Sequence, residues 1–158
     1  MKILFVCTAN ISRSFLAEQL LNHEIARLNL DHVSCTSAGI SALPGYPPDP
    51  RMVDFLHEQG KSFREHRSRP VTRELIDSAD LILVMERYHL QEILERWPDA
   101  EKKTRLFGFF LTDDGIVDDI IDPYGRSYHH YKMAQDQITL AVQNLIEKVI
   151  IPSKNQHA

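Results

Sequence analysis

A cysteine and an arginine separated by five residues lie near the amino terminus, in the segment Val6-Cys7-Thr8-Ala9-Asn10-Ile11-Ser12-Arg13-Ser14. Backbone N–H groups of a tight loop between them can converge on an oxyanion, and the Arg13 guanidinium can contact two of its oxygens at once. The same positive environment favours the thiolate, which is the nucleophilic form of cysteine. Ser14 can donate a hydrogen bond to that thiolate and ease its later departure. The spacing therefore predicts a phosphate-binding loop with a nucleophile at its base.

The segments on either side of this loop indicate how it is held. Residues 3–6 are continuously apolar, as in a strand buried on both faces of a parallel sheet, and residues 15–28 have the periodicity of an amphipathic helix. Cys7 is thus expected at the carboxyl end of a strand, where open α/β sheets bind ligands against helix N-termini. A Cys-x5-Arg pattern also arises by chance from a buried cysteine and a solvated arginine, but the strand-to-helix context favours the chemical interpretation.

The rest of the chain alternates apolar runs with amphipathic segments. Further strands are predicted at residues 33–37, 81–85 and 105–110, and further helices at residues 50–59, 72–78, 88–97 and along the apolar stripe 138–150. Residues 41–50 are rich in Pro and Gly and are expected to form a loop, and the charged residues 64–69 are expected to be exposed. Strands that alternate with helices predict an α/β fold with a parallel sheet and right-handed crossovers.

Length and composition limit the classes of protein to consider. With 158 residues and 43% hydrophobic content, the chain is expected to form one domain, residues 1–151, followed by a flexible tail at 152–158. Two cysteines, no signal-peptide pattern and no apolar run near 18 residues predict a cytoplasmic protein without membrane attachment. A net charge of -4 argues against nucleic-acid binding. The histidines show no metal-ligand spacing, so no metal or other cofactor is expected.

Several further motifs follow the first one in order: Thr36-Ser37-Ala38-Gly39, Asp49-Pro50-Arg51, His66-Arg67-Ser68-Arg69, Asp80-Leu81-Ile82-Leu83-Val84-Met85-Glu86 and Asp122-Pro123-Tyr124. With these motifs the chain resembles the low-molecular-weight protein tyrosine phosphatases along nearly its whole length. Residues 36–43 and Leu106-Phe107-Gly108 resemble the prokaryotic class associated with exopolysaccharide-export tyrosine kinases. The resemblance implies a three-layer fold, phosphotyrosine protein phosphatase I-like, with a four-stranded parallel sheet in flavodoxin-like order and helices on both faces.

The resemblance also implies a mechanism and a set of site residues. Cys7 would attack phosphorus to form a cysteinyl-phosphate while Arg13 and the loop hold the phosphoryl oxygens, and the loop residues are Thr8, Ala9, Asn10, Ile11, Ser12 and Ser14. Asn10, Ser37 and His66 match positions that brace this loop, with Asn10 in an unfavourable backbone conformation. The implied substrate is a phosphotyrosine protein, such as a bacterial tyrosine autokinase.

A phenolate leaving group has a pKa of about 10, so a carboxylic acid that protonates it contributes roughly 10²–10⁴-fold. The residues alone do not separate Asp122 from Asp113, Asp114, Asp118 and Asp119, since a loop aspartate is more often a turn residue. The resemblance selects Asp122 as the general acid and Tyr124 as an aromatic wall of the pocket. Many animal members carry another aromatic residue where this chain has Ala42 and Leu43, so Leu43 is expected at the pocket wall.

Two residues of the loop depart from the family pattern. Ala9 replaces a common glycine, which would cost about 1 kcal/mol if that residue needs a positive φ, and Ser12 replaces a second cysteine.

Two alternative functions are considered. An arsenate reductase on the same scaffold needs further cysteines after the third strand, and residues 86–97 contain none. A non-catalytic phosphotyrosine-binding module would keep the loop, but the intact Cys7, Arg13 and Asp122 argue against it.

Overall fold

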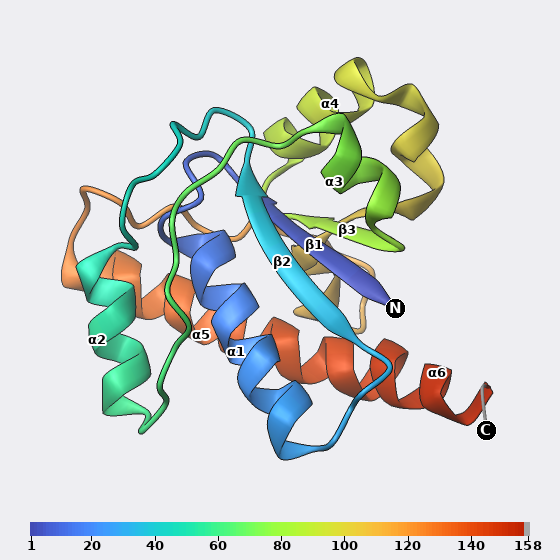
Figure 1. Cartoon of the computed structure of the whole chain (residues 1–158). Coiled ribbons are helices and arrows are strands. Elements are labelled where there is room, and N and C mark those ends of the chain that lie inside the picture. The colour runs from blue at the N-terminus through green and yellow to red at the C-terminus, as the bar shows by residue number, and fades with distance from the viewer. Residues whose placement is uncertain (157–158) are drawn as a thin grey trace.

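The computed structural model describes residues 1–156 and contains one parallel sheet between two layers of helices (Figure 1). In chain order the elements are β1 (Lys2–Cys7), α1 (Arg13–Arg27), β2 (Ser34–Gly39), α2 (Pro50–Glu58), α3 (Arg73–Ser78), β3 (Leu81–Val84), α4 (Arg87–Arg96), the 3₁₀ helix η1 (Pro98–Lys103), β4 (Thr104–Leu106), the 3₁₀ helix η2 (Phe107–Phe110), α5 (Tyr128–Leu145), the π-helical turn η3 (Ile146–Ile150) and α6 (Ile151–Gln156).

The four strands lie in the order β2-β1-β3-β4, and all neighbouring strands are parallel. Helices α1, α2 and α5 contribute to the core on one face of the sheet, and α3 and α4 to the core on the other (Figure 1). This arrangement confirms the predicted three-layer α/β fold with flavodoxin-like strand order.

The central strand β1 explains why the amino-terminal run is continuously apolar. Ile3 and Phe5 pack into the core beside α1, whereas Leu4 and Val6 pack into the core beside α4. Successive residues of a strand point to opposite faces, so a strand covered on both faces needs apolar residues throughout. Each such side chain contributes roughly 1.5–3 kcal/mol when fully buried.

The register brings the carboxyl ends of three strands to one edge of the sheet. Cys7, the last residue of β1, is aligned with Gly39, the last residue of β2, and Val6 is aligned with Val84 at the end of β3. The segments that follow these strands therefore begin side by side. This is the edge at which open α/β folds bind ligands.

The predicted strand at residues 105–110 is wrong for its last four residues, 107–110. Strand β4 ends at Leu106, and the chain turns into η2, which buries both Phe107 and Phe110 in the core beside α5. A Cβ on Gly108 would lie 1.7 Å from the backbone oxygen of Asp118, so only glycine fits this close approach. An apolar run of this length does not distinguish a strand from a helical turn.

The other expected elements are present with boundaries shifted by at most two residues, as helix and strand ends usually are, except that the helix expected along 138–150 begins ten residues earlier, at Tyr128. Thr72 caps α3 as predicted by the N-cap preference, since its side chain accepts a hydrogen bond from the Leu75 N–H at 3.3 Å. The charged segment 64–69 is not uniformly exposed: His66 and Ser68 are buried while Arg67 is exposed. That alternation places two polar side chains of this segment inside the molecule.

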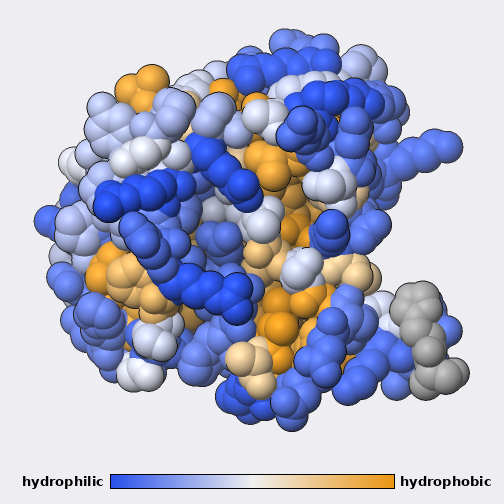
Figure 2. Space-filling model, in the orientation of Figure 1, coloured by the Kyte–Doolittle hydropathy of each residue, from blue (hydrophilic) through white to orange (hydrophobic). Residues whose placement is uncertain are grey.

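The carboxyl-terminal segment continues as a helix where a tail was expected. Helix α6 extends from Ile151 to Gln156, and residues 157–158 of the expected tail lie outside the described residues. Within residues 1–156, no helix is long and apolar enough to cross a membrane. Figure 2 shows a largely hydrophilic face with an apolar strip over the strands of the sheet.

Candidate active site

A cavity of about 390 Å³ opens at the end of β1. Its lining comes from β1 and the loop and helix start that follow it, the loop after β2, the segment between α2 and α3, and the segment that precedes α5: Cys7, Thr8, Ala9, Ile11, Ser12, Arg13, Ser41, Leu43, Tyr46, Ser68, Asp122 and Tyr124. The structure thus brings the predicted Cys7, Arg13, Leu43, Asp122 and Tyr124 to one site. Segments more than 100 residues apart in sequence meet there.

The loop between β1 and α1 depends on one unusual backbone conformation. Asn10 has a φ of 59°, in the left-handed region that asparagine tolerates better than most residues. This confirms the conformation expected for Asn10. Ala9 is not among the residues with positive φ in the described chain, so its substitution for glycine carries no such strain.

The end of β2 lies directly against this loop. The backbone N–H groups of Ile40 and Ser41 donate to the carbonyl oxygens of Cys7 and Thr8, both at 2.9 Å. A Cβ on Gly39 would lie 2.5 Å from the Thr8 backbone oxygen. Glycine at this position therefore permits the close approach that supports the first residues of the loop.

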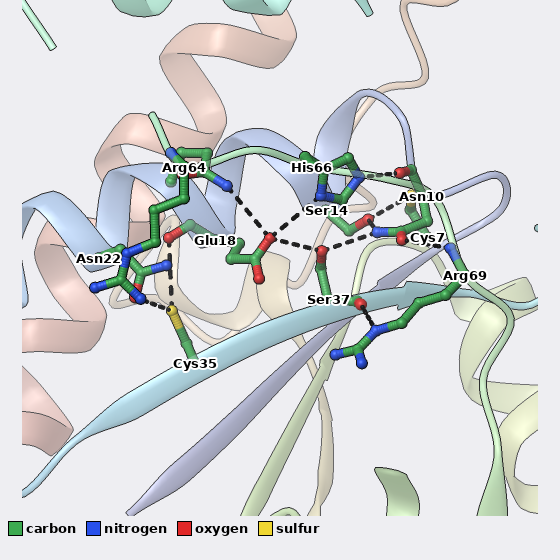
Figure 3. A network of polar contacts seen from close by, with 11 residues as sticks. Cys7, Asn10, Ser14, Glu18, Asn22, Cys35, Ser37, Arg64, His66 and Arg69 are labelled. Atoms are coloured by element: carbon green, nitrogen blue, oxygen red, sulfur yellow. Dashed lines mark hydrogen bonds and ion pairs between the residues drawn. The ribbon is translucent and has the colours of Figure 1, made fainter. Parts of the chain in front are cut away.

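A chain of hydrogen bonds from Ser37 through Asn10 and Ser14 lies behind the loop (Figure 3) and leads to the sulfur of Cys7. The Asn10 side-chain amide donates to Ser14 Oγ at 2.9 Å and to Ser37 Oγ at 2.8 Å. Ser14 Oγ lies 2.9 Å from Cys7 Sγ. Because Ser14 accepts from Asn10, its own hydroxyl hydrogen is free for a hydrogen bond to the sulfur.

His66 and its neighbours hold Asn10 from the other side (Figure 3). His66 is buried, and its Nε2 lies 2.7 Å from the Asn10 carbonyl oxygen, which can only accept. Its Nδ1 lies 3.6 Å from Glu18 Oε2, which also accepts a hydrogen bond from Ser37 Oγ at 3.0 Å. The Arg69 backbone N–H donates to Asn10 Oδ1 at 3.0 Å. All these contacts hold the loop from behind, and none of them involves a side chain that points into the cavity.

The side chains of Asn10 and Ser14 lie outside the cavity, although both residues were expected in the phosphate-binding loop. Neither lines the cavity, and both lie behind the loop with Ser37 and His66. The resemblance implies that residues 8–14 hold the phosphoryl oxygens through their backbone N–H groups, and that expectation stays a prediction.

Arg13 is held rigidly although it begins a helix. Its side chain is 1% exposed, and its Nη1 donates to the Ile120 carbonyl at 2.8 Å and pairs with Glu86 Oε1 at 2.6 Å. Two buried polar atoms of the loop, Arg13 Nε and Ser12 Oγ, have no hydrogen-bond partner within residues 1–156. Buried donors are rarely left unpaired, so these two suggest that an oxyanion accepts from them when it binds.

Asp122 is the aspartate of its segment that reaches the cavity. Of the aspartates considered above, Asp113, Asp114, Asp118 and Asp119 are not among the lining residues. Asp122 Oδ1 accepts from the Tyr124 N–H at 3.2 Å, and its Oδ2 lies 3.6 Å from Arg13 Nη2. Its side chain is 51% exposed, so it can exchange protons with solvent.

Three residues of the site were missed in the sequence. Glu86 orients Arg13, Tyr46 supplies a second aromatic side chain at the cavity, and His89 lies buried behind Thr8. The position of Glu86 directly after an apolar strand was a usable signal, because carboxyl ends of parallel strands share an edge. Ala42 is buried and does not line the cavity, so Tyr46 and Leu43 form this wall.

Comparisons with known proteins agree with this geometry. The family model described as low molecular weight phosphotyrosine protein phosphatase matches residues 2–155. The chain is 33% identical to the low molecular weight protein-tyrosine-phosphatase Etp of Escherichia coli over 147 residues, 93% of either chain. It is 34% identical to a protein-arginine-phosphatase of Bacillus subtilis over 149 residues, 94% of this chain and 97% of the relative.

A solved structure shows the same fold. The structure of Vibrio vulnificus Wzb in complex with benzylphosphonate superposes with a TM-score of 0.82 and 34% identity, covering 94% of this chain and 98% of that one. The family match spans nearly the whole chain, and its expected cysteine is present as Cys7. The chain therefore belongs to the low molecular weight phosphotyrosine protein phosphatase family.

Proposed function

We propose that this chain hydrolyses phosphotyrosine in proteins, with Cys7 as the nucleophile. The observation that carries the proposal is a thiol at the base of a cavity whose loop presents two buried polar atoms, Arg13 Nε and Ser12 Oγ, that have no hydrogen-bond partner in the described part of the chain. An oxyanion held there lies against the sulfur and accepts from donors already in place. Such preorganised donors stabilise charge without reorganisation during the reaction.

The proposed reaction has two displacements at phosphorus. In the first, the Cys7 thiolate forms the S–P bond, the bond between phosphorus and the phenolic oxygen breaks, and Asp122 gives its proton to that oxygen. In the second, Asp122 takes a proton from water, whose oxygen forms the new P–O bond as the S–P bond breaks. The products are the phenol, inorganic phosphate and the free thiolate, which Ser14 stabilises at 2.9 Å.

The cavity walls favour a phenyl ring as the group that carries the phosphate. Ile11, Leu43, Tyr46 and Tyr124 line the cavity above the loop, and such apolar side chains pack well against an aromatic ring.

Phosphoarginine is the second candidate, because the relatives include protein-arginine-phosphatases. Ile11, Leu43, Tyr46 and Tyr124 offer an aromatic ring more contact area than they offer a polar guanidinium, so phosphotyrosine is the proposed substrate.

We further propose that the protein substrate is the phosphotyrosine tail of a bacterial tyrosine autokinase. The support is the family class, which includes relatives named Wzb and Etp. The two free thiols, Cys7 and Cys35, fit a reducing, cytoplasmic compartment.

The test is phosphate release from peptides of one sequence that carry phosphotyrosine, phosphoarginine or phosphoserine, without added metal, by wild type and Cys7→Ser. We expect release from the phosphotyrosine peptide to be fastest, and to be abolished in Cys7→Ser. A faster reaction of the phosphoarginine peptide would replace the proposed substrate. Tight binding of the phosphotyrosine peptide without phosphate release would instead identify a binding module.

A further inference from the structure

His89 lies behind the phosphate-binding loop, in the first turn of α4, and is completely buried. Its Nε2 lies 2.8 Å from Oγ1 of Thr8, the residue that follows Cys7. Its Nδ1 accepts a hydrogen bond from the Glu86 backbone N–H at 3.0 Å. One imidazole thus connects the loop with the start of the helix whose Glu86 orients Arg13.

These two contacts determine which ring nitrogen carries the proton. The Glu86 N–H requires a lone pair on Nδ1, so the neutral ring has its hydrogen on Nε2. Burial, together with the positive charge of Arg13, lowers the pKa of His89 to about 4, and the ring is therefore neutral at ordinary pH. It follows that His89 Nε2–H is the donor and Thr8 Oγ1 the acceptor.

The direction of this hydrogen bond determines what the Thr8 hydroxyl can do. A hydroxyl that accepts from His89 still has its own hydrogen to donate. Thr8 Oγ1 has no second hydrogen-bond partner among residues 1–156, and Thr8 lines the cavity beside Cys7 and Arg13. An anionic phosphoryl oxygen in that cavity is a strong acceptor for this hydrogen.

We propose that the Thr8 hydroxyl donates a hydrogen bond to the phosphoryl group and that His89 is the positioning residue that aims it. Thr8 is then a catalytic residue through its side chain as well as its backbone N–H. His89 touches no substrate, since it does not line the cavity. The inference rests on the proposed phosphatase function, because it requires a phosphoryl oxygen in this cavity.

The first test measures orthovanadate binding by isothermal titration calorimetry to wild type, Thr8→Val and Thr8→Ser. Loss of a hydrogen bond to a charged group predicts binding about 10- to 100-fold weaker for Thr8→Val. Thr8→Ser keeps the hydroxyl and is expected to bind within about threefold of wild type. Unchanged binding by Thr8→Val would overturn the inference. Vanadate binding needs no turnover, so a failure of wild type to hydrolyse phosphotyrosine would reject the proposed function separately.

The second test links Thr8 to His89 through a double-mutant cycle. In His89→Asn, the side-chain oxygen can replace Nδ1 as the acceptor for Glu86, but the shorter side chain does not reach Thr8. We expect His89→Asn to weaken vanadate binding about as much as Thr8→Val, and the double variant to bind no more weakly than either. Additive losses would show that His89 acts on the site by another route and would overturn its assigned role.

The tautomer can also be measured on the unmodified protein, so the proposal does not depend on the folding of a variant. Long-range ¹H–¹⁵N NMR distinguishes a protonated Nε2 from a protonated Nδ1. The neutral Nε2–H form of His89 is expected throughout pH 5.5 to 7, above its pKa of about 4. A ring with hydrogen on Nδ1 would leave Thr8 to donate to His89 and would contradict the proposal.

Discussion

At the scale of single residues, Asp122 is exposed to solvent and also lines the cavity. Its Oδ2 faces Arg13 at 3.6 Å, and its side chain is 51% exposed. As the proposed general acid it must carry a proton, so Asp122→Asn is expected to lower kcat for phosphotyrosine by roughly 10²–10⁴-fold. The loss should be smaller for an aryl phosphate with a more acidic phenol, which leaves without a proton.

Steady-state kinetics on both substrates measure this difference. Asp119→Asn is the matched control, because Asp119 does not line the cavity. An Asp122→Asn enzyme with wild-type kcat for phosphotyrosine would remove Asp122 from the mechanism.

At the scale of elements, Asp49 joins α5 to the phosphate-binding loop through the start of α2. The Tyr131 hydroxyl donates to Asp49 Oδ2 at 2.6 Å, and the Asp49 backbone N–H donates to the Ile11 carbonyl at 2.8 Å. Asp49 also caps α2 by accepting from the Arg51 N–H at 3.0 Å. Burial, followed by the hydrogen bond to Asp49, raises the pKa of Tyr131, which keeps its hydroxyl protonated as a donor.

Removing that hydroxyl leaves a buried carboxylate with one donor fewer. Tyr131→Phe is therefore expected to lower the free energy of unfolding by about 2 kcal/mol, the range for a hydrogen bond to a charged group. Urea denaturation measures the change. Tyr128→Phe serves as the control, since Tyr128 is 77% exposed and its change should stay within about 0.5 kcal/mol. Equal stability of the two variants would contradict the role of this contact.

At the scale of the whole molecule, the buried neutral His89 makes stability depend on pH. Its pKa falls from 6.5 to about 4 in the folded chain. Between these values the unfolded chain binds a proton that the folded chain does not, so stability is lost as the pH falls through this range. The shift corresponds to at most about 3 kcal/mol.

Urea denaturation at several pH values between 7 and 4.5 tests this dependence in wild type and His89→Asn. The free energy of unfolding should fall more steeply with acidification in wild type, because the variant lacks the titrating group. His129→Asn, which alters an exposed histidine, is expected to follow wild type. Parallel curves for wild type and His89→Asn would show that His89 does not titrate as inferred.

The sequence predicted those features that depend on local pattern. The apolar run of β1 and the periodicity of α1 placed Cys7 and Arg13 on a strand end and a helix start, and the structure agrees. Strand pairing decides which residues become long-range partners: the sequence places Glu86 after a strand, but the pairing of β3 with β1 is what brings it to Arg13. Residues 107–110 were predicted as strand because they belong to a short apolar run, and a run of this length has no period that separates a strand from a 3₁₀ turn.

The central claim is that Cys7 carries the phosphate during turnover. The most direct measurement mixes Asp122→Asn with an aryl phosphate whose acidic phenol leaves without a proton, quenches the reaction within its first turnover and locates bound phosphate by peptide mass spectrometry. The first displacement then proceeds without the general acid, whereas loss of Asp122, which is proposed to activate the water, slows hydrolysis of the intermediate, so the intermediate accumulates. Phosphate on Cys7, and none in Cys7→Ser treated alike, is the predicted result. Turnover by wild type with phosphate on another residue would contradict the account.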